Sequence, residues 1–236
     1  MSDLDGRVIA IAGAGGGLGP TVAGRLAEAG ATVALTDRAQ DSLDALVTDL
    51  GLPDERVDAR VVDLLDPEAA AAWSAALVER FGGVQGLLHL VGGWKGGDPI
   101  ESFDLGDYEL LHDLLVRTVQ HTSRAFHAAL SAGDSGRFVL VSSSAAQKPT
   151  GTNAAYAATK SSAEAWTLAL AESFAQTPAT ANILVVNAII TPKMREENPG
   201  KDYPNFTSVE DIADALAYIC SDAAAKMNGQ RLSLHP

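Results

Sequence analysis

Residues 7–37 read "RVIAIAGAGGGLGPTVAGRLAEAGATVALTD", and this stretch decides the fold. It begins with a short apolar run of strand length, continues after the glycines as a helical pattern, and ends in a second apolar run at Asp37. Two such runs joined by a helix predict a βαβ unit, in which both strands lie parallel in one sheet.

The same alternation of strand and helix patterns continues along the rest of the chain. The strand-length runs "RVDARVVDL", "GLLHLVGG", "GRFVLVSSS" and "NILVVNAII" are each followed by a helical pattern, and "QRLSL" closes the series. We expect an α/β fold with a doubly wound (Rossmann), mostly seven-stranded parallel sheet and helices on both faces, in three layers. The chain is 47% hydrophobic and contains no Pro/Gly/Ser linker, so residues 1–236 are expected to form a single domain.

Composition excludes several classes of partner. The formal net charge of −13 repels phosphate backbones and anionic lipids, so we expect no nucleic acid and no membrane among the partners. The first residues carry acids where a secretory signal would carry bases. The single cysteine, Cys220, lies in a helical apolar pattern, which indicates a buried thiol in a reducing compartment. A cytoplasmic location is therefore expected.

A glycine-rich loop follows the first predicted strand. Gly13, Gly17 and Gly19 are spaced G-x-x-x-G-x-G, and Pro20 suits the first turn of the next helix. Glycines let the backbone approach a pyrophosphate closely, and free N–H groups at the helix start then bind its charge. A plain strand-to-helix turn also produces glycines, but the position between a clear strand and a clear helix favours a dinucleotide site.

Asp37 ends the second predicted strand, about 20 residues after the loop, where an acid binds the ribose hydroxyls of a dinucleotide. Its charge would repel a 2′-phosphate, and neither Gly16 nor Thr36 supplies a compensating cation, which favours NAD over NADP. The neighbouring Arg38 keeps NADP as the minority alternative. In another interpretation Asp37 is only the N-cap of the following helix.

Tyr156 and Lys160 stand four residues apart in "NAAYAATKSSAEAW", so a helix would place both on one face. A phenol normally keeps its proton to about pH 10, and an ammonium together with an oxidised nicotinamide would stabilise the phenolate. Lowering that pKa by two to three units takes about 3–4 kcal/mol. In the alternative interpretation neither residue is catalytic: Tyr156 is a buried aromatic side chain, and Lys160 is a surface lysine one turn later.

Ser143 lies at the end of the predicted strand "GRFVLVSSS", thirteen residues before the tyrosine. A hydroxyl at the carboxyl end of a parallel strand can hydrogen-bond a substrate oxygen. A merely polar strand exit explains the neighbouring Ser142 and Ser144 well, but it explains all three serines less well.

Taken in this order, these motifs resemble those of short-chain dehydrogenases/reductases of the single-domain kind, over essentially the whole chain. The resemblance rests on "AGAGGGLG", Asp37, "VVDLLD", Ser143, "YAATK", "VVNAI", "SVEDIA" and "NGQRLSL". It implies that Ser143 orients the substrate oxygen, Tyr156 is the acid/base, and Lys160 binds the nicotinamide ribose. It implies cofactor contacts from Gly13, Gly16, Gly17, Leu18, Gly19, Asp37, Asp63, Leu64, Gly92, Tyr156 and Lys160. Asp63 would lie against the adenine, although a loop-capping role is the alternative.

Four positions depart from the family pattern. His89, Leu90 and Val91 stand where the family has Asn-Asn-Ala before Gly92, and Leu115 stands where the next helix has a catalytic asparagine. We interpret His89 as a core histidine whose two ring nitrogens are both hydrogen-bonded. The histidines of that helix are nine and six residues apart, a spacing that does not suggest a metal site.

The leading functional hypothesis is an NAD(H)-dependent oxidoreductase that interconverts a secondary alcohol and a ketone, with NADP the less favoured cofactor. A catalytically impaired dinucleotide-binding sensor or scaffold is the alternative, opened by Leu115 and His89. A third possibility uses the same phenol for dehydration or isomerisation. The resemblance also implies a homodimer or homotetramer, paired through the two long helices after the fourth and fifth strands.

Overall fold

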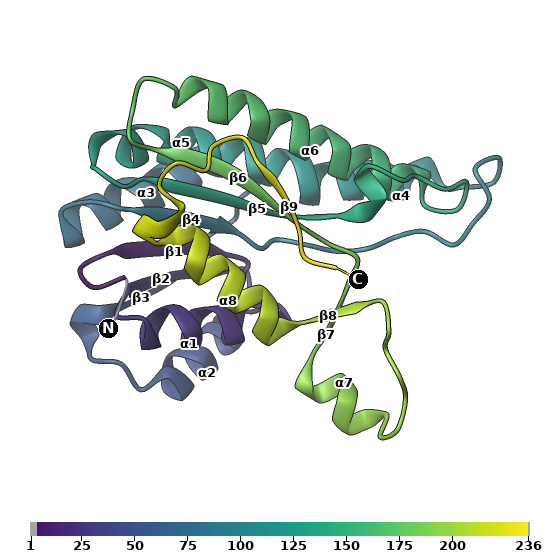
Figure 1. Ribbon diagram of the computed structural model, residues 1–236, viewed down its shortest axis with the longest axis horizontal. Coiled ribbons are helices and arrows are strands. Elements are labelled where there is room, and N and C mark those ends of the chain that lie inside the picture. Colours follow the sequence, from purple (N-terminus) through teal and green to yellow (C-terminus); the bar gives the residue numbers. More distant parts are fainter. Residues whose placement is uncertain (1–3, 236) are drawn as a thin grey trace.

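The computed structural model describes residues 4–235, and Figure 1 shows a central sheet with helices above and below it. The N-terminal half contains β1 (Val8–Ala12), α1 (Gly19–Glu28), β2 (Thr32–Asp37), α2 (Gln40–Leu50), η1 (Asp54–Arg56), β3 (Val57–Val61), α3 (Pro67–Phe81), β4 (Gly86–His89) and α4 (Leu105–His112). It continues through the short η2 (Asp113–Arg117) into α5 (Thr118–Ala132).

The C-terminal half carries the strand that ends at Ser143 and the helix that begins just before Tyr156. Its elements are β5 (Arg137–Ser143), η3 (Ser144–Ala146), α6 (Ala154–Ser173), β6 (Thr180–Val186), β7 (Ala188–Ile190), α7 (Pro192–Glu197), β8 (Phe206–Ser208), α8 (Val209–Cys220), η4 (Asp222–Ala224) and β9 (Arg231–Ser233). The strand and helix patterns of the sequence therefore correspond to real elements.

The main sheet has seven parallel strands in the order β3-β2-β1-β4-β5-β6-β9. This order confirms the doubly wound sheet predicted from the sequence. The chain reverses its direction of winding between β1 and β4, and the carboxyl ends of these two strands open a crevice in folds of this kind. The short strands β7 and β8 form a separate pair beyond that edge.

Alternate side chains of each strand enter two different cores. Ile9 and Ile11 of β1 pack with α1, α2 and α8, whereas Val8 and Ala10 pack with α3, α5 and α6. Figure 1 shows these helix sets on opposite sides of the sheet. A strand buried on both faces reads as a continuous apolar run, which is why the strands were visible in the sequence.

The long helix predicted after β4 is interrupted. Its residues form α4, then one π-helical segment at η2, then α5. The apolar periodicity runs through this segment without a break, so the sequence predicts one continuous helix. Leu115 in η2 is buried and packs with Leu111 and Ala155. A π-helical turn inside a helix is often found at functional sites.

None of the helices within residues 4–235 combines the length and the apolar character that a membrane crossing requires. In the same described part of the chain, no group of three or more His, Cys, Asp or Glu side chains is placed to hold a metal ion. Cys220 is a free, buried thiol on α8, as its apolar context predicts.

Candidate functional site

The glycine loop between β1 and α1 packs so tightly that two of its glycines have no room for a side chain. Gly13 has a φ of 84°, and a Cβ there would lie 2.8 Å from the Val91 nitrogen at the exit of β4. A Cβ on Gly19 would lie 2.0 Å from the carbonyl oxygen of Ala14. The backbone of the loop therefore lies directly against the end of β4 and against its own earlier residues, which requires glycine at these two positions.

The other side of the loop faces outward. Gly16 and Gly17 are exposed, and a Cβ on Gly17 would meet only the Thr191 methyl group, at 3.5 Å. The backbone N–H groups of Gly17 and Leu18 have no acceptor among residues 4–235. Free amides at the start of a helix, on a backbone without side chains, form a cradle that fits a pyrophosphate.

Asp37 braces this loop from the end of β2. One carboxylate oxygen accepts a hydrogen bond from the Gly15 N–H at 2.9 Å, and the other accepts from Arg38 N–H at 2.7 Å. The N-cap of α2 is Ala39, so the alternative in which Asp37 caps that helix is wrong. The carboxylate thus lies beside the glycine loop, at the end of β2.

The residues after β3 lie at the same edge of the sheet. Asp63 is exposed and its carboxylate accepts from Leu65 N–H at 2.9 Å, whereas Asp66 supplies the N-cap of α3. Leu64 is buried, and its carbonyl oxygen is 3.0 Å from His121 Nδ1. Asp63 therefore shapes its own turn, and the helix-capping role belongs to its neighbour.

Ser143, Tyr156 and Lys160 come together at the carboxyl end of β5. Ser143 ends the strand, and the other two lie one turn apart near the start of α6, with the Lys160 Nζ 6.0 Å from the tyrosine ring centre. Ser143 and Lys160 are buried, and Tyr156 is partly buried. The alternative interpretation, in which Lys160 is a surface lysine, is therefore wrong.

Burial controls the ionisation of this group. It raises the pKa of Tyr156, while a hydrogen bond with the Ser143 side chain acts in the opposite direction. Burial also lowers the pKa of Lys160 to about 8, and the carboxylate of Glu164 opposes that shift. The sequence predicted that Lys160 and an oxidised nicotinamide together lower the phenol pKa, but in the protein alone burial dominates and the pKa is raised. The protein alone keeps the phenol neutral at pH 7.

The side chain of Lys160 is fixed by the neighbouring strand, since its Nζ donates a 3.0 Å hydrogen bond to the carbonyl oxygen of Val141. An ammonium has three donors, and this contact uses one of them. One helical turn further along α6, Glu164 is buried and contacts Ser142 and Arg231. The sequence reasoning missed Glu164, although its i+4 spacing from Lys160 places it on the same helix face.

His89 ends β4 and is completely buried. Its two ring nitrogens each lie 3.1 Å from a threonine hydroxyl of α5, those of Thr118 and Thr122. Burial and the positive charge of Lys160 lower the pKa of His89 to about 3. The imidazole is therefore neutral and satisfied, which supports its reading as a core histidine.

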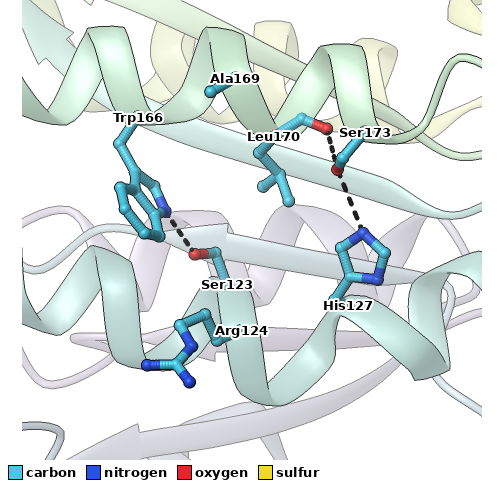
Figure 2. A pocket seen from close by; sticks show the side chains of 7 residues that line it. All are labelled: Ser123, Arg124, His127, Trp166, Ala169, Leu170 and Ser173. Carbon is cyan, nitrogen blue, oxygen red and sulfur yellow. Dashed lines mark hydrogen bonds between the residues drawn. The ribbon is translucent and has the colours of Figure 1, made fainter.

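A shallow hollow of about 390 Å³ lies away from this group, on the outer side of α5 and α6. Figure 2 shows that it runs between the two helices, and its lining residues are Ser123, Arg124, His127, Trp166, Ala169, Leu170 and Ser173. The Trp166 indole N–H donates to the Ser123 hydroxyl at 2.9 Å along its floor. This is a surface feature of the helix pair, separate from the crevice at the strand ends.

Comparison with known proteins gives a consistent picture. The family model described as short chain dehydrogenase matches residues 7–202. The chain is 28% identical over 240 residues to levodione reductase of Leifsonia aquatica, covering 94% of this chain and 90% of the relative. It is 25% identical over 243 residues to 7alpha-hydroxysteroid dehydrogenase of Escherichia coli K12, covering 98% of this chain and 93% of that enzyme.

Solved structures share the fold. A short-chain type dehydrogenase/reductase from Mycobacterium ulcerans superposes with a TM-score of 0.89 at 24% identity, covering 98% of this chain and 89% of the other. At 24% identity, this match shows a shared fold and nothing further.

Proposed function

Because the chain belongs to the short chain dehydrogenase family, whose relatives are oxidoreductases, we propose that it is an NAD(H)-dependent enzyme that interconverts a secondary alcohol and a ketone. The observation that carries this proposal is the meeting of Ser143, Tyr156 and Lys160 at one strand end, on the edge of the sheet that also holds the glycine loop.

Several residues of the crevice would contribute to binding the dinucleotide. The free amides of Gly17 and Leu18 would hold its pyrophosphate, and the Asp37 carboxylate would bind the hydroxyls of the adenosine ribose. Asp63, which is exposed beside this edge, would lie against the adenine. When bound, the nicotinamide supplies or accepts the hydride.

The catalytic residues handle the proton. Tyr156 donates a proton to the substrate oxygen in ketone reduction and removes one in alcohol oxidation. Ser143 presents a hydroxyl to the same oxygen and holds it near the phenol. Lys160 keeps a positive charge near Tyr156, so that the phenolate needed for alcohol oxidation becomes more accessible.

Asp37 supports NAD over NADP, because its carboxylate, held beside the glycine loop by the Gly15 N–H, would repel a 2′-phosphate on the adenosine ribose. Arg38 is exposed beside it and is the one feature on that loop that favours the phosphate. Calorimetric titration with NAD, NADH, NADP and NADPH tests this choice. We expect tight binding of the first pair, and the Asp37→Ser variant should lose the discrimination. Tighter binding of NADPH by the native protein would refute the assignment.

A dinucleotide-binding sensor is the second candidate, and Leu115 is the observation that favours it. Its apolar side chain, packed on Ala155 beside Tyr156, cannot hydrogen-bond as the family asparagine does. A screen of small ketones and alcohols, read by the change in NADH absorbance, separates the candidates. Dinucleotide binding without hydride transfer to any of them would favour the sensor, and net hydride transfer would also exclude an isomerase or dehydratase.

We also propose that two copies pair through α5 and α6, where the hollow around Trp166 offers an apolar seat for a second copy. Sedimentation should show a dimer or tetramer. Ala169→Arg, in the hollow, should produce monomers, whereas Ala72→Arg, on the exposed side of α3, should not. A native protein that sediments as a monomer at all concentrations would contradict the pairing.

A further inference from the structure

Glu164 is an acidic side chain buried in the interior of the protein, with about 1% of its surface exposed. One carboxylate oxygen accepts a 2.6 Å hydrogen bond from the Ser142 hydroxyl on β5. The other accepts a 2.7 Å bond from Arg231 Nε, which reaches it from β9 at the sheet edge. Both oxygens accept and both partners donate, so the ionised carboxylate is the form that this arrangement satisfies.

Three successive residues of β5 are joined to three turns of α6. The Val141 carbonyl oxygen accepts from Lys160, the Ser142 hydroxyl donates to Glu164, and the Ser143 side chain bonds to Tyr156. Figure 1 shows α6 lying along this part of the sheet. Glu164 is the end of this series that is furthest from Tyr156 along α6, and its bond to Arg231 anchors the series to β9.

The surroundings of the Lys160 ammonium contain few charges. Tyr156 and Glu164 flank it on α6, and the neutral His89 lies on β4. Among these groups only Glu164 carries a full negative charge. A buried ammonium without a nearby anion tends to lose its proton.

We propose that Glu164 is a positioning residue, which keeps Lys160 charged and aligned with Tyr156 by presenting a carboxylate fixed between Ser142 and Arg231. Its consequence for catalysis rests on the proposed function, but its effect on Lys160 does not. Arg231 then limits this effect, because its guanidinium partly neutralises the carboxylate that the lysine feels.

A lysine titration followed by NMR tests this directly. The protein is labelled with ¹³C and ¹⁵N in its lysines, the Lys160 signal is assigned with Lys160→Arg, and no substrate or cofactor is needed. In the native protein we expect a Lys160 pKa of about 8. In Glu164→Gln it should fall by about one unit, because a charge one helical turn away is removed from a poorly solvated site.

Two further variants separate charge from packing. Ser142→Ala removes the hydrogen bond but keeps the carboxylate, so the pKa of Lys160 should stay within a few tenths of a unit of the native value. Arg231→Gln keeps the carboxylate and removes its partly exposed cation, so the pKa of Lys160 should rise by about half a unit. If Glu164→Gln does not fold, the rise of the Lys160 pKa in Arg231→Gln tests the proposal by itself.

Opposite shifts in the Glu164 and Arg231 variants support the proposal. An unchanged Lys160 pKa in both, or an equal fall in Glu164→Gln and Ser142→Ala, would mean that Glu164 serves packing alone. Because the titration is independent of turnover, this result stands apart from any failure to find hydride transfer.

Discussion

His89 of β4 and Lys160 of α6 are two buried bases on the same side of the sheet, yet the protein treats them differently. Both lose solvation, which disfavours the cation. His89 meets two hydroxyls and the positive charge of Lys160, and its pKa falls to about 3, whereas Lys160 has a carboxylate one turn away and its pKa falls only to about 8. The ordinary pKa values of the two side chains, 6.5 and 10.5, set most of this difference, and the charges around each base widen it.

The largest effect is expected from removing the charged base. Lys160→Met should lower turnover by about 100-fold or more, because Tyr156 loses its cation. The same change should stabilise the fold by up to about 3 kcal/mol at pH 7, since the folded protein binds the lysine proton more weakly than the unfolded chain, whose pKa is near 10.5. Turnover assays and urea denaturation measure the two effects.

That gain should fade as the pH rises from 8 towards 10.5, where the unfolded lysine also becomes neutral. Arginine at the same position, which stays charged, is the matched control and should not stabilise the protein. If Lys160→Met is less stable than the native protein throughout this range, the ammonium is better solvated than the structure indicates.

A smaller effect is expected from the neutral base, in acid. Below pH 6.5 the unfolded chain protonates His89 while the folded protein does not until about pH 3, so stability falls as the pH drops. Between pH 6.5 and 5 the loss should be about 2 kcal/mol. His89→Leu should show less of this acid sensitivity in thermal or urea unfolding. An identical pH dependence in the variant would show that His89 is not the cause.

The smallest effect should come from the hydroxyls around His89. Thr122→Val keeps the shape of the side chain but removes the contact with the imidazole, at a cost of about 1 kcal/mol in unfolding free energy. It should leave the NMR titration of Lys160 unchanged. A shift of the Lys160 pKa would show instead that the loss of this hydroxyl reaches the lysine, and it would contradict the prediction.

The sequence contained enough to predict the sheet and the principal side chains of the site. The glycine loop and Asp37 were recognisable because dinucleotide-binding βαβ units have a fixed spacing, and Tyr156 and Lys160 because a helix turn places them together. Even so, the contact between Asp37 and Gly15 depends on the packing of β2 against β1, which spacing alone does not reveal.

What was not predictable depends on contacts between distant segments. The partners of Glu164 come from two other elements, Ser142 from β5 and Arg231 from β9. Arg231 is 67 residues away from Glu164 in the sequence. The π-helical segment η2 interrupts an unbroken apolar pattern, so periodicity predicts a plain helix there. Likewise, three-residue strands such as β7 and β8 carry too little pattern to be recognised.

The central claim is that Tyr156 transfers the proton within a pocket that binds a dinucleotide independently of that hydroxyl. The direct test is a pair of measurements on the Tyr156→Phe variant. NADH binding is measured by calorimetry, and turnover is measured with the best ketone from the screen. We predict nearly native binding and a turnover lower by about 10²- to 10⁴-fold. Turnover close to that of the native enzyme would contradict the account.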